Sequence, residues 1–364
     1  MDSEKLVKEL QQERKSIKTD SYSMSIGELV NLYKDGELKL NPAFQRLYRW
    51  DDNQKTDFIE SILIGIPIPE IFVAQKEDGK WDVVDGVQRI STLLQLTGEL
   101  KGKEPLVLKE TTYLPSIVDF TWNTLPMEVK RILRRAKIGI NIILTENSIQ
   151  SQYELFKRLN TGGLHLEDQE IRNCLLIMIN EQFYEVINKL KEYDNFKKCL
   201  NLKEEKYEKE YHMELIIRYL IAKINIVNYD EYNISQDKLS MFFDREITRI
   251  IESSIVDVNK EIIIFKKTFD YLYNTLGEEA FRKYNTSKNK FEGPFSPTSF
   301  ELIVSGLANS IDKISQKDEE EFKKNIINMY NDKRYQEAAK RGVKAINRFR
   351  ALAEFSKGYF ENEV

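Results

Sequence analysis

The sequence predicts an α+β protein in which an N-terminal α/β domain is followed by a mostly α-helical domain. Two observations predict this fold class. Short β-rich runs alternate with helical periodicity up to about residue 147, whereas from residue 148 onward apolar residues recur almost entirely at helical spacing. We therefore expect an N-terminal extension over residues 1–23, the α/β domain over 24–147 and the helical domain over 148–364.

The elements of the α/β domain follow in order along the chain. Apolar residues at helical spacing predict helices over 25–34, 53–64 and 88–96. Runs rich in β-branched and aromatic residues predict strands over 38–40, 71–74, 81–84 and 138–144. Pro67 and Pro69 end the second helix because proline cannot continue it, and Gly79 marks a hairpin turn between two of the strands.

The remainder of the chain is predicted to be helical. Apolar residues with helical periodicity predict helices over 148–159, 171–179, 261–276 and 299–314. A stretch rich in Ser, Asn, Gly and Pro over 285–297 predicts a loop. The boundary near residue 147 is a change of periodicity and not a flexible linker.

Composition narrows the classes of protein. The net charge of −4 does not indicate general nucleic-acid binding, so DNA contacts would depend on local basic patches. Cys174 and Cys199 lack metal-type spacing and do not predict a disulfide framework. The polar N-terminal segment has no signal-peptide pattern, and no apolar run is long enough to span a bilayer. We expect a cytoplasmic protein without a membrane partner.

The strongest candidate site is the run Asp85, Gly86, Val87, Gln88 and Arg89, where a strand ends and a helix begins. Such a turn directs free backbone N–H groups and the positive end of the helix dipole at one point, which suits phosphate. The guanidinium of Arg89 also suits phosphate oxygens, and Asp85 can hold a divalent cation or orient a water. The alternative is structural: Asp85 caps the helix and Arg89 forms an ion pair.

A second candidate lies at a strand-to-helix junction over residues 41–50. Gln45 and Arg46 could contact a base or phosphates, and Tyr48 or Trp50 could stack on a base. In the alternative, the two aromatic residues are half-buried core and Arg46 pairs with a nearby Asp.

A third candidate is the glycine-containing stretch over residues 160–163, which includes Asn160 and Thr161, with Glu170, Arg172 and Asn173 downstream. The local alternative is the C-cap of a helix and an interhelical turn. The cluster is nonetheless more polar than a turn requires.

Other patterns add little catalytic chemistry. His165 and His212 are far apart and belong to no metal-ligand motif, so we predict no metal site of protein ligands alone. Two basic clusters could meet a DNA backbone, and in the alternative they are solvated helix faces. Their most prominent members are Arg131, Arg134, Arg135, Lys340, Arg341 and Lys344.

Several motifs, taken in order, resemble the N-terminal domain family of GmrSD-type restriction endonucleases. Each motif alone is weak, but the ordered set over residues 24–180 is specific. The matching positions are Gln45, Arg46, Tyr48 and Trp50; Ser61, Ile62, Leu63, Gly65, Pro67 and Pro69; Asp85, Gly86, Gln88 and Arg89; Phe156, Arg158, Asn160, Thr161, Gly162 and Gly163; and the run Glu170, Ile171, Arg172 and Asn173.

The resemblance implies a ParB/sulfiredoxin-like α/β core that binds and hydrolyses a nucleoside triphosphate, with Mg²⁺, in antiphage defence. Members of the family often recognise modified phage DNA and are paired with a His-dependent nuclease domain. The catalytic positions implied here are Asp85, Gln88 and Arg89. The nucleotide-binding positions implied are Gln45, Arg46, Tyr48, Gly86, Ser91, Thr92, Asn160 and Thr161.

This sequence departs from the family in two ways. Val87 replaces the usual second glutamine, and the C-terminal nuclease domain is absent, so we predict no DNA cleavage by this chain alone. The leading hypothesis is a nucleotide-hydrolysing sensor or regulator that acts with DNA and a separate nuclease subunit. The alternative is a non-enzymatic DNA-binding or adaptor protein with a degenerate pocket. A third hypothesis is a nuclease that acts through the ParB-like core itself.

Overall fold

The computed structural model describes residues 19–40, 50–144, 167–233 and 236–362, together with Val7, Leu10 and Tyr153. The chain divides into two compact units, Met1–Leu166 and Glu167–Val364. The predicted boundary near residue 147 falls beside residues outside the described part, so the expected domain limits stay a prediction.

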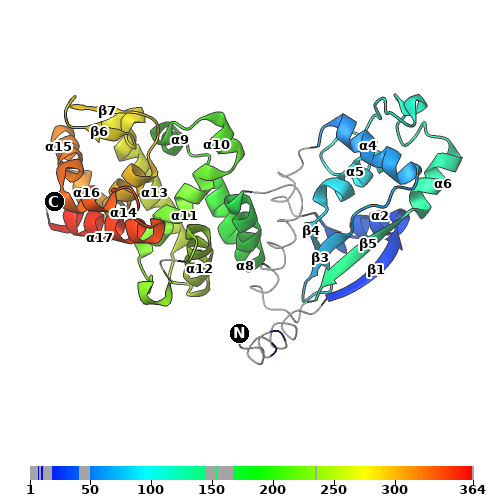
Figure 1. Ribbon diagram of the computed structural model, residues 1–364, viewed down its shortest axis with the longest axis horizontal. Helices are drawn as coiled ribbons and strands as arrows, with labels where there is room; N and C mark the ends of the chain where they lie inside the picture. The colour runs from blue at the N-terminus through cyan, green and yellow to red at the C-terminus, as the bar shows by residue number, and fades with distance from the viewer. Residues whose placement is uncertain are drawn as a thin grey trace. The chain divides into compact units, whose positions relative to one another are not determined.

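The first unit is built on a five-stranded mixed sheet in the order β1-β5-β3-β4-β2 (Figure 1). Its strands are β1 (Thr19–Ser25), β2 (Leu38–Lys39), β3 (Ile71–Gln75), β4 (Trp81–Asp85) and β5 (Lys137–Ile143). Strand β5 pairs antiparallel with β1 and parallel with β3, while β4 pairs antiparallel with β3 and parallel with β2. This arrangement places the end of β4 next to the beginning of β3.

Four helices contact one another above the strands in Figure 1. They are α2 (Ile26–Lys34), α4 (Asp52–Leu63), α5 (Val87–Thr97) and α6 (Met127–Arg135), and a short 3₁₀ helix, η1, covers Pro115–Ile117. Ser25 caps α2, and Asp51 with Gln54 forms a capping box at the start of α4. Ile90 and Leu94 of α5 are completely buried, as are Val73 and Val83 of the sheet. The amphipathic pattern of α5 therefore packs its apolar face into the core.

The second unit is almost entirely helical. Its helices are α8 (Asp168–Leu190), α9 (Asp194–Leu200), α10 (Glu204–Glu208), α11 (Tyr211–Ile224), α12 (Leu239–Glu252), α13 (Val258–Leu276), α14 (Pro297–Ile314), α15 (Glu319–Asn331), α16 (Lys333–Ala338) and α17 (Ala345–Asn362). Two 3₁₀ helices, η2 and η3, cover Tyr229–Glu231 and Gly277–Glu279. Strands β6 (Lys283–Asn285) and β7 (Lys290–Glu292) form a small antiparallel hairpin.

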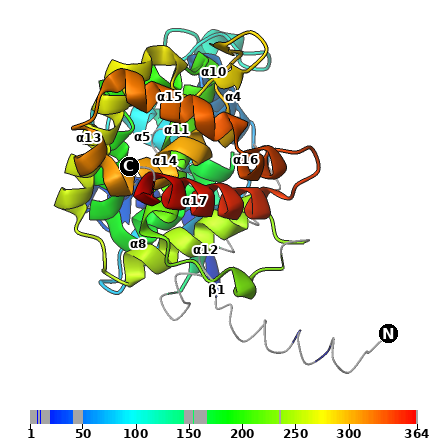
Figure 2. The ribbon, with the colours of Figure 1, turned by 90° about the vertical axis from the view of Figure 1, so that its left-hand side faces the viewer.

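Helices α14 and α17 lie side by side (Figures 1 and 2). A Cβ on Gly306 would lie 2.2 Å from the carbonyl oxygen of Ser356, so only glycine allows this approach. The amide N–H of Gly306 donates to Oγ of Ser356 over 2.8 Å. The backbones of α14 and α17 therefore approach each other closely at Gly306.

The α+β fold class is confirmed, with a mixed sheet in the first unit and helices in the second. Two expectations were wrong in detail. Strand β1 occupies residues that were assigned largely to an N-terminal extension, and part of the predicted loop over 285–297 forms the hairpin of β6 and β7. The helix expected over 148–159 lies outside the described residues. Across the described part of the chain, no helix has the length and apolar character needed to cross a membrane.

Candidate functional site

The site begins at the turn between β4 and α5. Gly86 adopts a left-handed conformation with φ 90° and ψ 15°, and it is the N-cap of α5. A Cβ at this position would lie 2.8 Å from Cγ1 of Ile71, so both the backbone angle and the packing require glycine. No side-chain hydrogen bond caps this helix. Its first-turn N–H groups and the positive end of its dipole therefore lie directly after the carboxylate of Asp85.

Arg89, in the first turn of α5, holds three segments together. Its Nη1 donates to the carbonyl oxygens of Pro69 and Glu70 over 2.5 and 3.0 Å, just before β3 begins. Its Nη2 donates to Oδ2 of Asp85 over 2.9 Å. The Arg89 side chain is 13% exposed and that of Asp85 is 34% exposed. The structural alternative predicted an ion pair for Arg89, and this ion pair is present. It also predicted that Asp85 caps α5, but the N-cap residue is Gly86.

Two further polar residues lie beside this turn and were not found by sequence reasoning. Nδ2 of Asn141 on β5 donates to Oε2 of Glu70 over 2.6 Å. A Cβ on Gly139 would lie 2.8 Å from Cγ of Glu70, so the Glu70 side chain lies directly over β5. The only sequence signal was a polar residue, Asn141, within a run of isoleucines. A carboxylate is thereby added to the same region as Asp85 and Arg89.

Gln88 connects the site to the second motif. The backbone N–H of Trp50 donates to Oε1 of Gln88 over 3.3 Å. The Trp50 ring packs on Phe58 of α4, with centroids 5.5 Å apart. The structure therefore brings the end of the 41–50 motif to the first turn of α5. The other predicted members of that motif, Gln45, Arg46 and Tyr48, lie outside the described residues.

The remaining predicted positions on α5 face the protein interior. Val87 is 7% exposed, and Ser91 and Thr92 are buried. Oγ1 of Thr92 donates to the carbonyl oxygen of Gln88 over 2.8 Å, which is a common local bond within a helix. Because position 87 faces the core, the replacement of glutamine by valine removes no group from the open side of the turn. The nucleotide-binding role of Ser91 and Thr92 stays a prediction.

The third motif divides between the two parts of the chain. Asn160 and Thr161 lie outside the described residues. Arg172, on α8, is completely buried, and its Nε donates to Oδ1 of Asp244 on α12 over 2.7 Å. Its Nη2 donates to the carbonyl oxygen of Ser240 over 3.2 Å. Arg172 therefore joins two helices inside the second unit.

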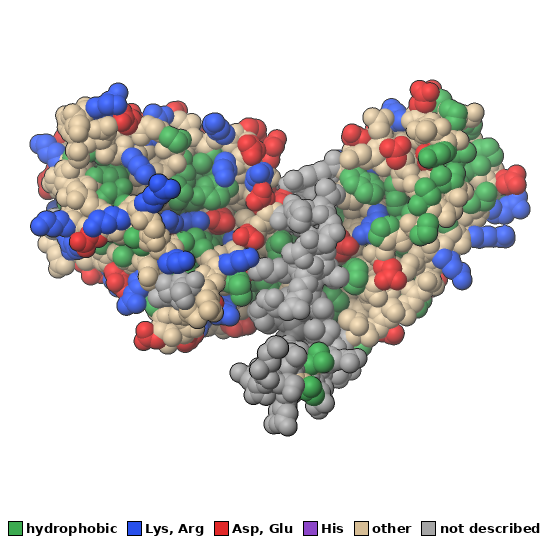
Figure 3. All heavy atoms as spheres, viewed as in Figure 1, with side chains coloured by type: hydrophobic (Ala, Val, Ile, Leu, Met, Phe, Trp, Pro, Cys, Tyr) green, Lys and Arg blue, Asp and Glu red, His purple; other side chains and the backbone are tan. Residues whose placement is uncertain are grey.

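The predicted DNA-contacting residues occur in both units. Arg131, Arg134 and Arg135 are exposed on α6. Lys340, Arg341 and Lys344 are exposed between α16 and α17. Figure 3 shows lysine and arginine side chains among carboxylates on the visible face of the second unit.

Metal-binding and thiol chemistry find little support where the structure is described. No group of three or more His, Cys, Asp or Glu side chains in those ranges could hold a metal ion. His212 is buried against the ring of Tyr207, with centroids 5.1 Å apart, and His165 lies outside the described ranges. Cys174 and Cys199 are free and buried, and burial raises the pKa of the Cys199 thiol to about 12.

Comparison with protein families matches residues 26–177 to the GmrSD restriction endonuclease, N-terminal domain. The match begins at α2, includes the Asp85 to Arg89 turn and ends within α8. Comparisons with curated proteins and with solved structures found no match.

Proposed function

Because residues 26–177 match the model of the GmrSD restriction endonuclease, N-terminal domain, we propose that this chain binds and hydrolyses a nucleoside triphosphate. In this proposal it is the sensor or regulatory component of a prokaryotic restriction-type antiphage system. It acts with DNA, including modified phage DNA, and with a nuclease on a separate subunit.

The observation that carries the proposal is the turn at Gly86. Its left-handed conformation places the uncapped N-terminus of α5 immediately after a partly exposed carboxylate. Backbone N–H groups at a helix N-terminus bind phosphate oxygens, and a carboxylate beside them can hold Mg²⁺ through one oxygen or through water. The bound nucleoside triphosphate supplies a phosphoanhydride bond whose hydrolysis releases phosphate. The residues of this chain bind the nucleotide, orient the attacking water and hold Mg²⁺.

Each residue of the turn has a distinct proposed role. Asp85 holds Mg²⁺ or orients the attacking water, and Gln88 positions polar groups of the nucleotide beside Trp50. Arg89 is a positioning residue, because its guanidinium fixes the Asp85 carboxylate and the backbone before β3. Gln45, Arg46 and Tyr48 are proposed nucleotide contacts. The backbone N–H of Trp50 is hydrogen-bonded to Gln88, and Gln45, Arg46 and Tyr48 precede Trp50 by at most five residues in the sequence.

The second candidate is an adaptor with a degenerate nucleotide pocket. One observation favours the adaptor. The Arg89 guanidinium already donates three hydrogen bonds to protein oxygens, so phosphate is not needed to satisfy these donors. In this case the basic residues of α6 and of the segment before α17 bind DNA without nucleotide turnover.

The test is phosphate release with each nucleoside triphosphate, with and without DNA, in the presence of Mg²⁺. We expect Asp85→Asn, which keeps the shape of the side chain, to lower turnover at least about tenfold. Asp57→Asn, on the exposed face of α4, is the matched control and should leave turnover unchanged. Calorimetric titration that detects no binding at millimolar nucleotide would instead support the adaptor.

DNA cleavage is a separate test. We expect the purified chain to leave plasmid DNA intact with Mg²⁺ or Mn²⁺. Nicking that survives purification and disappears on Asp85→Asn would support the hypothesis of a nuclease within the core.

A further inference from the structure

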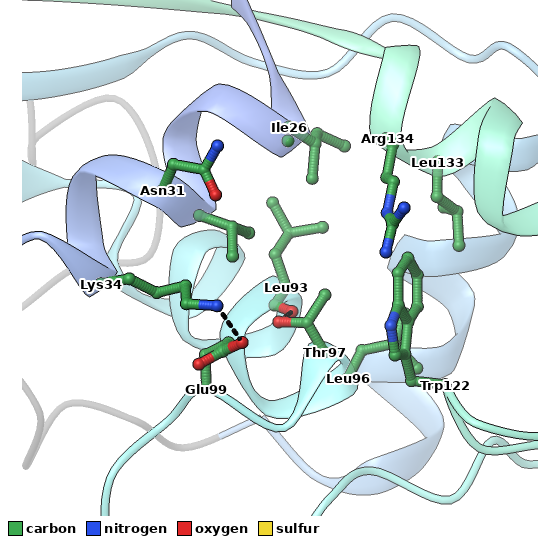
Figure 4. Close-up of a pocket in the computed structure, with 12 residues that line it drawn as sticks. Ile26, Asn31, Lys34, Leu93, Leu96, Thr97, Glu99, Trp122, Leu133 and Arg134 are labelled. Atoms are coloured by element: carbon green, nitrogen blue, oxygen red, sulfur yellow. Dashed lines mark hydrogen bonds and ion pairs between the residues drawn. The ribbon is translucent and has the colours of Figure 1, made fainter.

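A pocket of about 370 Å³ lies in the first unit between α2, α5, α6 and the segment that carries Trp122 (Figure 4). Small-molecule sites in proteins typically begin at this size. The pocket is formed by described residues throughout, and no part of the candidate functional site lines it.

The floor of the pocket is apolar. Val30 of α2, Leu93 and Leu96 of α5 and Leu133 of α6 line it, and each is buried in the core. These side chains come from three helices, and α2 contacts both α5 and α6, so the floor is held by the packing of the unit itself. An apolar body placed here removes carbon surface from water, which is the main favourable term for binding such a group.

The rim of the pocket is charged at two ends. At one end Nζ of Lys34 lies 2.9 Å from Oε1 of Glu99, so this pair is neutral overall. At the other end the guanidinium of Arg134 lies 5.4 Å from the centroid of the Trp122 ring (Figure 4). Within the described ranges no carboxylate forms an ion pair with Arg134. The rim therefore has one positive charge that no carboxylate of the described residues pairs with.

The pocket is also separate from the Gly86 turn. Both involve α5, but the turn is at the N-terminus of this helix and the pocket is beside its C-terminal half. Leu93, the lining residue of α5 nearest to the turn, is seven residues beyond Gly86, and at 1.5 Å per residue they span about 10 Å.

We propose that this pocket binds a small amphipathic anion, with an aromatic body on the apolar floor and a single anionic group at Arg134. The single uncompensated charge favours a carboxylate or sulfonate over a polyanion such as a triphosphate. The Trp122 ring beside Arg134 favours a planar body, because aromatic rings pack well against an indole edge or face.

The test uses two probes of the same shape, 2-naphthoate and neutral 2-naphthylmethanol, in calorimetric titrations of the full chain. We expect saturable binding of naphthoate at one per chain. Arg134→Gln should weaken the affinity for naphthoate by about fivefold, which corresponds to about 1 kcal/mol for a solvent-exposed charge contact. The same variant should leave the affinity for naphthylmethanol unchanged. Arg135→Gln, an exposed neighbour on α6 that does not line the pocket, is the matched control and should change neither affinity.

A filled pocket should bind neither probe. Thr97→Phe places an aromatic ring over the apolar floor, and Asn31→Trp places one there from α2. If one of these variants lowers the melting temperature, the other is used for the binding test. Mg²⁺–ATP should leave naphthoate affinity unchanged, because the sites are separate. The proposal is overturned if wild type binds neither probe, if Arg135→Gln has the same effect as Arg134→Gln, or if both filled variants bind as wild type does. None of these outcomes depends on nucleotide hydrolysis.

Discussion

Nη2 of Arg89 lies 2.9 Å from Oδ2 of Asp85, which joins the first turn of α5 to the last residue of β4. The same guanidinium donates to two carbonyl oxygens just before β3. One side chain therefore fixes the geometry of the turn through three hydrogen bonds. We expect its removal to lower the stability of the fold, whether or not a ligand is bound.

We predict that Arg89→Ala lowers the free energy of unfolding by about 1–3 kcal/mol, because a partly buried carboxylate and two carbonyl groups lose a charged donor. Thermal and denaturant unfolding would measure the loss. Arg89→Lys should recover part of it, since an ammonium group keeps the charge but not the fork geometry. Arg131→Ala on exposed α6 should change stability by less than about 0.5 kcal/mol. An unchanged melting temperature for Arg89→Ala would contradict the bracing role.

Gly86→Ala tests the steric requirement of the turn. Gly86 and Gly79 have φ of 90° and 81°, but a Cβ at position 86 would meet Ile71 at 2.8 Å, whereas a Cβ at 79 meets nothing within 4 Å. Gly79→Ala should therefore cost only the backbone strain of about 1–2 kcal/mol. We expect Gly86→Ala to cost clearly more, measured by the midpoint of urea unfolding. Equal losses would show that the contact with Ile71 relaxes freely.

The buried pair of Arg172 and Asp244 predicts a large effect in the second unit. Arg172→Ala should destabilise by about 3–5 kcal/mol, because it removes the arginine that pairs with the buried carboxylate of Asp244. The double variant Arg172→Met with Asp244→Leu should recover most of the loss, since neither charge remains. Lys198→Ala breaks an exposed pair with Asp194 and should cost less than about 1 kcal/mol. Denaturant unfolding of the three variants would separate these cases.

Glu60 should make stability depend on pH. Burial alone would raise the pKa of Glu60, but the nearby Thr111 side chain and hydrogen bonds donated by the N–H groups of Leu114 and Tyr113 together hold that pKa below its ordinary value. A carboxyl group with a lowered folded-state pKa contributes stability above its unfolded pKa and loses it as pH falls through the folded one. We expect the melting temperatures of wild type and Glu60→Gln to converge on acidification from pH 7 to pH 3. Glu104→Gln, on an exposed loop, should show no such convergence.

Local patterns predicted four of the five strands of the large sheet and the helices α2, α4, α5, α8, α13 and α14, because these elements have clear periodicity. The other helices of the second unit were covered only by the general expectation of a helical second half. Strand β1 was missed since only Met24 of its seven residues is buried, so no alternation of apolar residues marks it. It is held instead by backbone pairing with β5, which no local pattern reveals. The short hairpin of β6 and β7 was missed for a similar reason, because its turn residues resemble a loop.

The candidate site was predicted where it depends on neighbouring residues and missed where it depends on distant ones. The run from Asp85 to Arg89 contains its own turn and helix start, so the sequence was sufficient to place the turn and the start of α5. Glu70 and Asn141 are 71 residues apart, and Arg172 and Asp244 are 72 residues apart. Such pairings follow from tertiary packing, which a single sequence does not specify by spacing.

The pairing of β1 with β5 also sets the order of events during synthesis. Ser25 pairs with Lys137, so more than a hundred residues must be translated before the first strand has a partner. At about 5–20 residues per second the ribosome needs several seconds for that stretch. Closing so long a loop is also entropically costly, which makes this step a late and slow one. Throughout that interval β1 and the edge of β3 that β5 later occupies both lack their strand partner.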